Sequence, residues 1–437
     1  MSTDLLVTHV VAGCAIIIGL GFALGALCRR LRQPEVIGQI AAGIALGGSV
    51  LGRIWPQLFH ELLPTQVVPY INVVAQVALV LFLFSVGYEL DLRVLRIQRR
   101  LVPTVAAAAF VVPMLLGGGS VFAFGSLYRD TGGTGQHRGA FILFIAVALS
   151  ITALPVLAGI VGERGIGSTR PAVVALATAG AIDGVGWLAL TAAVLMDGTA
   201  TAAGRSMLIT LALFVGYVLV MVFAVRPLLL RWLRRPGALA RSNVPVIVAI
   251  AMTSAWATSA LGLHVIFGAF LAGLIMPRTE DGAPDADLVR PIEQAGSLLM
   301  PVFFVVAGLP VNLSGMTGSA WILLTVVCVL AMAGKLGGGY LGARLGGLPR
   351  REAAAVGAML NTRGLTELIA LNIGLQDGII SRGLYTVLVI MALVTTALTG
   401  PLLNLLRVPA PGFTARRRTA TAKAEPEAGP LSEPVVR

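Results

Sequence analysis

The sequence predicts an all-α polytopic membrane protein with about thirteen transmembrane helices, arranged as an inverted repeat of six plus six around a linker helix. Three observations lead to this class. Hydrophobic residues make up 57% of the 437 residues and charged residues only 12%, too few to cover a water-facing surface. Apolar runs of about 20 residues, long enough to span a bilayer, recur along the chain. Two pairs of these runs also share sequence motifs, which indicates an internal repeat.

The expected spans follow the apolar runs, and short basic or Gly/Pro-rich connections separate them. They cover residues 5–28, 34–51, 69–90, 101–125, 139–161, 172–195, 206–230, 243–261, 264–277, 295–311, 319–343, 353–375 and 383–406. When the connections are assigned alternately to two sides, one side holds 24 Lys and Arg residues and the other holds 5. By the positive-inside rule, the N-terminus lies outside and the C-terminus lies in the cytoplasm. The net charge of +12 therefore reports topology and not a nucleic-acid partner.

The two ends of the chain and its cysteines narrow the class further. The first span has no basic segment before it, so we expect it to stay in the protein and not to be cleaved as a signal peptide. Residues 409–437 are rich in Pro, Ala and charge and predict a disordered tail. Because the three cysteines lie inside apolar runs without CxxC spacing, we expect no disulfide framework, no resident metal and no cofactor.

The repeat rests on motifs that recur in the same order. Residues 34–51 contain IGQIAAGIALGG, and residues 264–277 contain FGAFLAGLIMP at an offset of 230. Residues 69–90 end in LFLFSVGYEL, and the corresponding VFFVVAGLPV follows at an offset of 221. The two halves run in opposite directions through the membrane. This is typical of secondary transporters, although small residues also recur by chance wherever membrane helices pack.

The repeat pairs residues 139–161 with residues 353–375, and both segments carry residues that interrupt a helix. These residues are Ser150, Thr152 and Pro155 in the first segment, and Asn361, Thr362 and Gly364 in the second. Proline removes a backbone donor, and Ser, Thr and Asn compete for backbone hydrogen bonds. Because broken backbone at membrane depth is tolerated only where it lines a cavity or is covered by protein, this pair of segments predicts a transport site.

Four ionisable residues lie well inside the expected spans: Asp183, Lys335, Arg363 and Glu367. Each costs at least about 2.5 kcal/mol to insert, so each needs a partner or a water-filled cavity. Arg363 and Glu367 are spaced i, i+4, and a structural ion pair is favoured over direct ion binding. Asp183 has only small or apolar neighbours and is the strongest candidate for the ion-binding carboxylate. Lys335 is its expected counter-charge or a second titrating group.

These segments together resemble the monovalent cation/proton antiporter-2 family, whose membrane domain is of the sodium/hydrogen exchanger type. The resemblance rests on FLFSVGYELDL, ALSITALPVLAG, AIDGVGW, HVIFGAFLAGLIMP, PVFFVVAGL, AGKLGGGYLGARL and NTRGLTELIALNIG. It implies one transmembrane domain over residues 1–408 that forms a homodimer. It also implies core helices at about 101–195 and 319–406 that move like an elevator against dimerisation helices at about 5–90 and 243–311, with a linker helix at about 206–230.

The chain departs from this family's pattern in the sixth span. Many members carry two adjacent acidic residues, or Asn-Asp, where this chain has Ile182 and Asp183. Counting back from Gly186 and Trp187 places Asp183 on the second, essential carboxylate and Ile182 on the first position. Lys335, which the resemblance pairs with that first acid, must therefore find Asp183 or remain without an acidic partner.

The sequence thus predicts a cytoplasmic-membrane antiporter that exchanges protons for Na⁺ or K⁺ and is electroneutral. Asp183 binds the proton or, transiently, the metal cation, and the hydroxyl groups of Thr152 and Ser150 supply further oxygen ligands. The partners are monovalent cations, protons, the lipid bilayer and a second copy of the chain, with no nucleic acid. The alternatives are a proton-coupled exporter of an organic cation, a channel, and an intramembrane enzyme, for which no HExxH or Ser/His/Asp arrangement is found.

Overall fold

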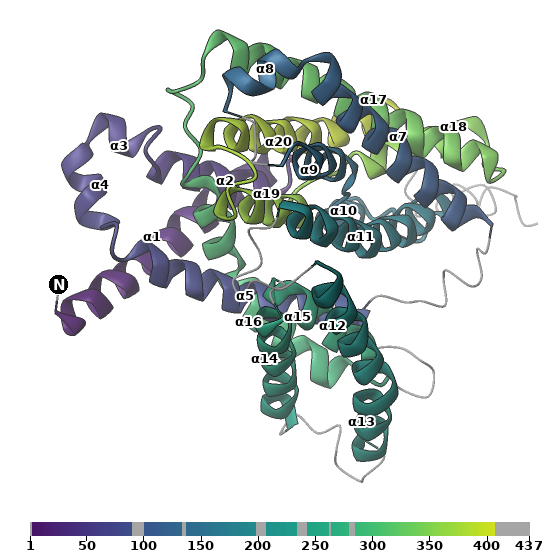
Figure 1. Ribbon diagram of the computed structural model, residues 1–437, viewed down its shortest axis with the longest axis horizontal. Helices are drawn as coiled ribbons and strands as arrows, with labels where there is room; N and C mark the ends of the chain where they lie inside the picture. The colour runs from purple at the N-terminus through teal and green to yellow at the C-terminus, as the bar shows by residue number, and fades with distance from the viewer. Residues whose placement is uncertain are drawn as a thin grey trace, which may run out of the picture.

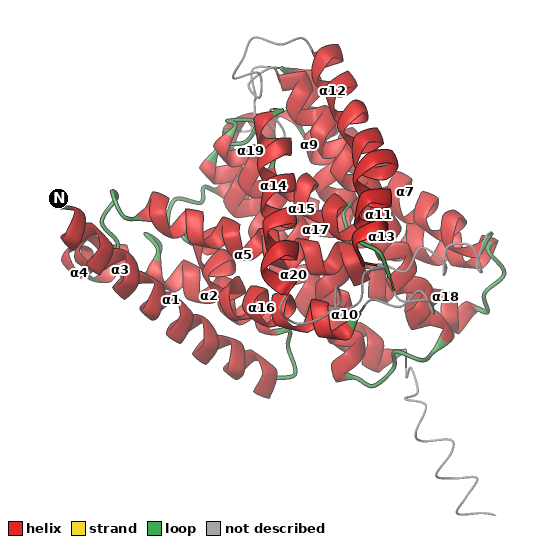
Figure 2. Cartoon of the chain, turned by 90° about the horizontal axis from the view of Figure 1, so that it is seen from below, coloured by secondary structure: helices red, strands yellow, loops and turns green. Residues whose placement is uncertain are grey.

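The computed structural model describes residues 2–89, 100–132, 137–197, 207–233, 243–261, 264–278 and 285–406, and every secondary-structure element in these ranges is a helix (Figure 2). The prediction of an all-helical chain is confirmed for these residues. The tail over residues 409–437 lies outside them. In chain order the elements are α1 (Thr3–Arg30), α2 (Glu35–Leu46), α3 (Leu51–Ile54), α4 (Pro56–Leu62), α5 (Val68–Glu89), α7 (Leu101–Ala123), α8 (Gly125–Asp130), α9 (Arg138–Ser150), α10 (Leu154–Glu163), α11 (Arg170–Asp197), α12 (Met207–Val220), the π-helix η1 (Met221–Val225), α13 (Arg226–Leu233), α14 (Val244–Ala260), α15 (Val265–Ile275), α16 (Ala286–Gly308), α17 (Gly318–Leu345), α18 (Arg350–Leu360), α19 (Leu365–Gln376) and α20 (Arg382–Leu405).

The chain is a multi-pass membrane protein. Ten helical segments within the described ranges are long and apolar enough to cross a bilayer, and α14 and α15 are shorter apolar helices. The first eleven expected spans and the last one each coincide with one of these helices, whereas the span expected at 353–375 corresponds to α18 and α19, which are not among them. One boundary is wrong: the span expected at 295–311 begins nine residues earlier, at Ala286. The Asp285 carboxylate caps that helix by accepting the Asp287 N–H at 2.9 Å, while Arg290 and Glu293 lie on its exposed side.

The helices form two groups (Figure 1). We call α7, α9–α11 and α17–α20 the crossing bundle, and α1, α2, α5 and α14–α16 the flanking bundle. In Figure 1 the crossing bundle fills the upper right, while α14–α16 extend below it together with α12 and α13. The chain passes from the first half of the crossing bundle to the second half of the flanking bundle through α12, η1 and α13. Both bundles are therefore built from segments that are far apart in the sequence.

Glycines set the spacing of the flanking bundle, and they do so in two matching places. A methyl group added at Gly38 of α2 would collide with the backbone of Leu24 in α1. A methyl group added at Gly268 of α15 would collide in the same way with Ser254 in α14. Close backbone approach through small residues is how membrane helices gain packing energy without a hydrophobic driving force. The pairs α1–α2 and α14–α15 therefore use the same contact.

A second matching contact links each of these pairs to the opposite half of the chain. A methyl group at Gly43 of α2 would collide with the backbone of Val305 in α16. A methyl group at Gly273 of α15 would collide with the backbone of Phe84 in α5. Gly43 and Gly273 are 230 residues apart, and Phe84 and Val305 are 221 apart, the two offsets of the sequence motifs. The same close approach thus occurs twice: once from a glycine of the first half to the second half, and once from a glycine of the second half to the first.

Glycines also bring α17 against α7 at the centre of the crossing bundle. A methyl group at Gly334 would lie 2.8 Å from Cα of Pro113, and one at Gly338 would lie 2.6 Å from the carbonyl oxygen of Ala108. Both positions therefore require glycine. Because Lys335 lies between these two contacts, the packing carries its side chain into the interior, where it is fully buried.

Candidate functional site

Two helices of the crossing bundle are interrupted at its centre. The first break separates the end of α9 at Ser150 from the start of α10 at Leu154, and the second separates α18 from α19. The two breaks lie against each other, because the N–H of Ala153 donates to the carbonyl oxygen of Thr362 at 3.2 Å. Four helix ends therefore meet in the interior of the protein: the C-terminal ends of α9 and α18 and the N-terminal ends of α10 and α19.

The first break arises from backbone chemistry around Pro155. This proline is the second residue of α10 and has no N–H, so a continuous helix across this point would lack a hydrogen bond. Ile151 and Ala153 have extended backbone, with ψ of 145° and 95°. The hydroxyl of Ser150 stays within α9 and donates to the carbonyl oxygen of Ala146 at 2.6 Å. What Ser150 presents to the break is its carbonyl oxygen.

The second break depends on Gly364 and on two threonines of α20. Gly364 has φ of +148°, a conformation that residues with a side chain rarely adopt. The side-chain amide of Asn361 donates to the carbonyl oxygen of Thr395 at 2.9 Å. Thr396 accepts the N–H of Arg363 at 2.9 Å and donates its hydroxyl to the carbonyl oxygen of the same residue at 2.8 Å. These contacts replace the helical hydrogen bonds that the break removes.

Positive side chains cover the C-terminal end of α9. Arg363 donates from Nη1 to the carbonyl oxygen of Ala148 at 2.9 Å and from Nη2 to that of Leu149 at 2.6 Å. Lys335 donates to the next carbonyl oxygen, that of Ser150. Since a helix C-terminus carries a partial negative charge, the two cations neutralise three successive carbonyl groups where water is excluded.

Lys335 is surrounded by neutral oxygens. Besides the Ser150 carbonyl, its Nζ contacts the carbonyl oxygen of Ala109 at 3.2 Å and Oγ1 of Thr152 at 2.6 Å. Thr152 uses its own hydrogen toward the carbonyl oxygen of Leu360 at 3.2 Å, so it must accept from the lysine. In its ammonium form, Lys335 can donate to all three oxygens and so join α7, α9 and the first break.

Asp183 lies in α11 beside the N-terminal end of α10. Its side chain is buried, with 4% exposed, and its Oδ2 accepts the N–H of Leu154, the first residue of α10, at 3.4 Å. Oδ1 has no hydrogen-bond partner among the described residues. No ion pair joins Asp183 to Lys335 in the part of the chain that the structure describes. The preceding residue, Ile182, is 1% exposed and leaves the carboxylate without an acidic neighbour in sequence.

Arg363 and Glu367 form an ion pair inside the second break. Nη1 of Arg363 lies 3.0 Å from Oε1 of Glu367, and both side chains are fully buried. Glu367 belongs to the first turn of α19, where a negative charge is favoured by the helix dipole. Oε2 of Glu367 has no partner among the described residues. The pair therefore fulfils the i, i+4 spacing but leaves one carboxylate oxygen unused.

Several buried polar atoms around the breaks lack a hydrogen-bond partner within the described residues. They are Oδ1 of Asp183, Oγ1 of Thr178, Oδ1 of Asn361, Oγ1 of Thr362, Oγ1 of Thr366, Oε2 of Glu367 and Nε of Arg363. Buried polar groups are normally satisfied, so such a concentration around the two breaks is unusual. The sequence analysis did not single out Thr178 or Thr366. Two features of the sequence could have pointed to them. Thr178 lies five residues before Asp183, and Thr366 follows directly after the second break.

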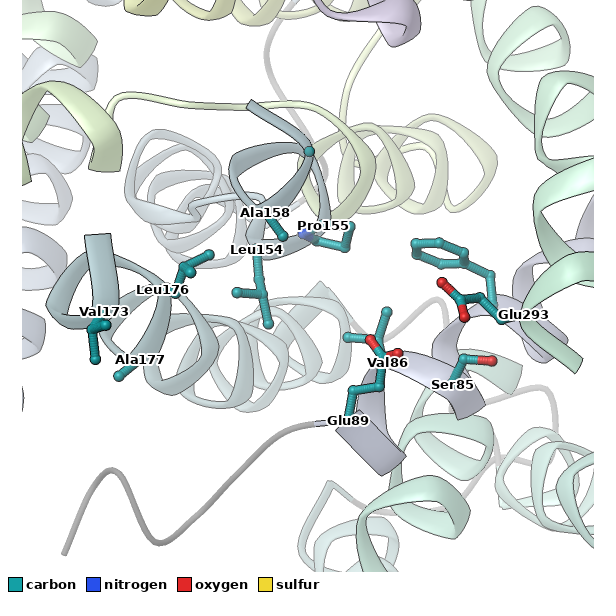
Figure 3. Close-up of a pocket in the computed structure, with 12 residues that line it drawn as sticks. Ser85, Val86, Glu89, Leu154, Pro155, Ala158, Val173, Leu176, Ala177 and Glu293 are labelled. Atoms are coloured by element: carbon teal, nitrogen blue, oxygen red, sulfur yellow. The ribbon is translucent and has the colours of Figure 1, made fainter. Parts of the chain in front are cut away.

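A cavity of about 500 Å³ opens beside the first break, between α10 and α11 on one side and α5 and α16 on the other. Figure 3 shows Glu89 and Glu293 facing it from the flanking bundle and Leu154 and Pro155 from the crossing bundle. The sequence analysis named neither glutamate as a site residue and missed the cavity. Leu154 links the cavity to the buried carboxylate, because it lines the cavity and its N–H binds Asp183.

A second cavity of about 280 Å³ continues along the other side of Pro155 and is lined also by Glu35 and Glu163. The two cavities share Phe82, Pro155 and Gly159, so together they follow the boundary between the bundles. Within the described residues, no three His, Cys, Asp or Glu side chains are placed to hold a metal ion together. The polar groups at the crossing are single carboxylates, hydroxyls and carbonyls, which suit weak binding of a hard monovalent cation.

Comparison with known proteins gives a consistent set of relatives. Residues 15–406 match the family model described as sodium/hydrogen exchanger, transmembrane. The chain is 34% identical over 397 residues to the Na(+)/H(+) antiporter NhaS4 of Synechocystis, covering 90% of this chain and 96% of the relative. It is 36% identical over 412 residues to Cation/H(+) antiporter 20 of Arabidopsis thaliana, covering 91% of this chain. It spans only 48% of that longer relative, as it spans about half of several other relatives.

The fold also matches a solved structure. The sodium proton antiporter MjNhaP1 of Methanocaldococcus jannaschii superimposes with a TM-score of 0.67, covering 94% of this chain and 99% of that protein. The sequences are 15% identical, so this likeness concerns the fold alone. The helical architecture is therefore that of a solved antiporter, while the side chains at the crossing have to be interpreted from this chain itself.

Proposed function

The chain belongs to the sodium/hydrogen exchanger family of secondary transporters, and from this premise we propose that it exchanges protons for Na⁺ or K⁺ across a membrane. The observation that carries the proposal is the Asp183 carboxylate. It is buried at the crossing of two broken helices, it keeps one oxygen without a partner, and it lies next to a residue that lines a cavity. Intramembrane ionisable groups in such positions mark ion pathways.

Competition for Asp183 couples the two ions. The carboxylate binds either a proton or a metal cation, and the empty, charged form is costly to carry through the membrane. Lys335, Arg363 and Glu367 compensate charge around it. We assign the hydroxyl of Thr152 to holding Lys335, since the lysine already occupies it, and that of Ser150 to α9.

The repeated glycine contacts support thirteen membrane helices in an inverted repeat. Ten long segments, the two shorter helices α14 and α15, and the interrupted pair α18–α19 make up this number. The contact of Gly43 with Val305 and that of Gly273 with Phe84 are related by the sequence offsets of 230 and 221. An inverted repeat with paired broken helices favours alternating access over a channel.

We further propose that the crossing bundle moves as an elevator against the flanking bundle. The helices of the crossing bundle come from the core regions at about 101–195 and 319–406, and those of the flanking bundle come from the dimerisation regions at about 5–90 and 243–311. The linker at 206–230 corresponds to α12, η1 and the first part of α13. The cavities lie along the boundary of the bundles on the side of Glu89 and Glu293, which the basic-residue count places in the cytoplasm. The proposed state is therefore open toward the cytoplasm, in a homodimer of the cell membrane.

The test is exchange in proteoliposomes with an imposed pH gradient. Na⁺, K⁺ and Li⁺ are added in turn, and gradient dissipation is followed with a pH-sensitive dye. We expect dissipation by Na⁺ or K⁺ with the wild-type protein and none with empty vesicles. Dissipation by none of the three cations at any pH between 6 and 9 contradicts the proposal.

A second candidate function is proton-coupled export of an organic cation. It is favoured by the volume of the cavity, about 500 Å³, and by its apolar walls with two carboxylates. The same assay separates the two functions when organic amines are added to the series. Dissipation by amines, with none by alkali cations, assigns the export function.

A further inference from the structure

Two hydrogen bonds join the crossing bundle to the flanking bundle near the start of α20. The hydroxyl of Tyr385 donates to the carbonyl oxygen of Ala307 in α16 at 2.6 Å. The next residue, Thr386, accepts the N–H of Asn312 at 3.0 Å. The side chains of Tyr385 and Thr386 are both fully buried. We call these two hydrogen bonds the α16–α20 contact.

The flanking side of this contact is held firmly in place. A methyl group added at Gly308 would lie 2.5 Å from the carbonyl oxygen of Ile40, so the end of α16 is in close backbone contact with α2. Ala307 lies in the last turn of α16, where carbonyl groups lack a partner within the helix. The N–H of Val311, four residues later, donates to Gly308 instead, at 3.2 Å. Tyr385 therefore satisfies a carbonyl group that the helix leaves open.

The cavities lie toward the other end of the same boundary. Glu293 lines the larger cavity and precedes Ala307 by 14 residues in α16. At 1.5 Å per residue, these two positions are about 21 Å apart along the helix. The boundary between the bundles is thus hydrogen-bonded at one end and hollow at the other. Access to the crossing from the hydrogen-bonded end requires the α16–α20 contact to break.

The proposed inverted repeat gives this contact a counterpart at the larger cavity. Helices α11 and α20 begin 212 residues apart, at positions 170 and 382, and this offset pairs Tyr385 with Val173. The motif offset of 221 pairs Ala307 with Val86. Both valines line the larger cavity, Val86 from α5 and Val173 from α11. The bundles are therefore separated at the place that corresponds, in the other half of the chain, to the α16–α20 contact.

We propose that the α16–α20 contact stabilises the state in which the cavities are open, and that the opposite access state forms when this contact breaks and Val86 approaches Val173. The proposal rests on the proposed antiport by alternating access and adds residues that set the balance between its two states. An interaction made in one state only shifts the equilibrium by its own free energy. Tyr385 and Thr386 are thus positioning residues, because they act on the position of the crossing bundle.

The main variant is Tyr385→Phe, which removes the hydroxyl and keeps the ring. Tyr128→Phe is the matched control, because the hydroxyl of Tyr128 is also buried and forms a hydrogen bond with Ser120 at 2.8 Å, but this bond joins α8 to α7 and does not cross the boundary. Exchange is measured in inside-out and right-side-out vesicles from cells that express the protein. Each preparation gives the half-saturating concentration, on one membrane face, of the cation that the wild type exchanges.

The ratio of these two concentrations reports the balance of the two states, because the apparent affinity on each face scales with the population of the state open to it. We expect Tyr385→Phe to change the ratio about three- to tenfold in favour of the face remote from the cavities, which is the effect of losing one hydrogen bond. Tyr128→Phe should keep the wild-type ratio. A merely structural role of Tyr385 would lower the maximal rate and leave the ratio unchanged.

Labelling of a thiol measures the two states without transport. Ala177 lines the larger cavity, and the offset of 212 pairs it with Val389, which is fully buried. Val389→Cys is introduced into a background without the three native cysteines, and an impermeant maleimide is added to the face remote from the cavities. We expect Tyr385→Phe to speed labelling about three- to tenfold and Tyr128→Phe to leave it unchanged. Thr386→Val should speed it as well, and it replaces Tyr385→Phe if that variant does not fold.

Unchanged labelling together with an unchanged ratio in Tyr385→Phe and Thr386→Val would overturn the proposal. Failure of the underlying antiport function shows separately, as wild-type vesicles that exchange no cation. Labelling still tests the α16–α20 contact in that case, because it depends on the two states and not on the transported ion.

Discussion

The two helix breaks lie side by side in the crossing bundle, yet their polar groups are used in opposite ways. In the first break, Arg363 and Lys335 donate to the last three carbonyl oxygens of α9. In the second break, the last carbonyl oxygen of α18 receives only a hydroxyl, from Thr152, and the side chains of Asn361 and Thr362 keep oxygens without partners. We call the first break, over residues 151–153, the locked break, because basic side chains bind its carbonyl oxygens. We call the second break, over residues 361–364, the open break, because it keeps neutral oxygens without partners.

This difference indicates that the charged groups of the crossing have two separate roles. Bringing four helix ends together in a bilayer creates partial charges of both signs, which need compensation where water is absent. The cations lie at the C-terminal end of α9, while Asp183 and Glu367 lie at the N-terminal ends of α10 and α19. Only Asp183 has neither an ion-pair partner nor a hydrogen bond to Oδ1 among the described residues. In the proposed mechanism, Lys335 and Arg363 hold the geometry of the crossing, and Asp183 exchanges a proton for a cation.

Neutralising Asp183 should produce the largest effect on this arrangement. We expect Asp183→Asn to lower exchange more than about 100-fold, because Asn keeps the size and polarity but cannot hold a proton or a cation in alternation. The folded protein should persist, since the site accommodates the neutral, protonated carboxyl in every cycle. Exchange in proteoliposomes measures the loss, and size-exclusion chromatography with a melting curve measures the fold.

Glu293→Gln is the matched control for this substitution. Glu293 also loses a charge, but it is exposed at the cavity and not buried at the crossing. We expect it to change exchange severalfold at most, through the local cation concentration. Wild-type exchange in Asp183→Asn would move the site elsewhere, with Glu367 and its unpartnered Oε2 examined first.

The sequence predicted this region only in part, for physical reasons. Hydropathy locates spans because lipid accepts only apolar segments, and Pro155 and Gly364 mark breaks because their backbone chemistry is local. The partners of Lys335 depend on how α7, α9 and α17 pack, which no local pattern encodes. The sequence therefore offered the hydroxyl of Ser150 as a ligand, whereas its carbonyl oxygen is the group that contacts Lys335.

The locked break should be the more sensitive of the two to loss of a fixed charge. Arg363→Gln removes two contacts to α9 and leaves Glu367 as a buried, unpaired charge. Breaking a buried ion pair by removing one partner costs about 3–5 kcal/mol, so we expect a large fall in melting temperature. Adding Glu367→Gln should recover part of the loss. A double variant less stable than Arg363→Gln would contradict the ion-pair explanation.

The open break should be sensitive to its backbone. Gly364→Ala places a methyl group 2.9 Å from Cγ2 of Val156 on a residue with φ of +148°. Strain of this kind costs about 1–3 kcal/mol. Gly162→Ala in α10 is the control, because its added methyl group meets nothing within 4 Å. We expect the melting temperature to fall in Gly364→Ala and not to fall in Gly162→Ala. Equal melting temperatures of the two variants would contradict the requirement for glycine at position 364.

The smallest expected effect is that of membrane potential on the exchange rate. With Ile182 beside Asp183, the crossing has one carboxylate free to alternate, so each half-cycle carries one positive charge whichever ion is bound. A net charge per cycle would need a second group that takes up a proton on one limb only. Lys335 is engaged with three oxygens, and Glu367 is paired with Arg363.

The measurement is exchange in vesicles with potentials imposed by a valinomycin-mediated K⁺ gradient, with Na⁺ as the exchanged cation. One net charge per cycle would be driven by about 2.3 kcal/mol per 100 mV, enough to change the rate many-fold. We expect no dependence on potential, because the fixed charges of the locked break stay in place through the cycle. Acceleration by potential would refute a single alternating carboxylate. Its loss in Lys335→Gln would then identify the lysine of the locked break as the second proton carrier.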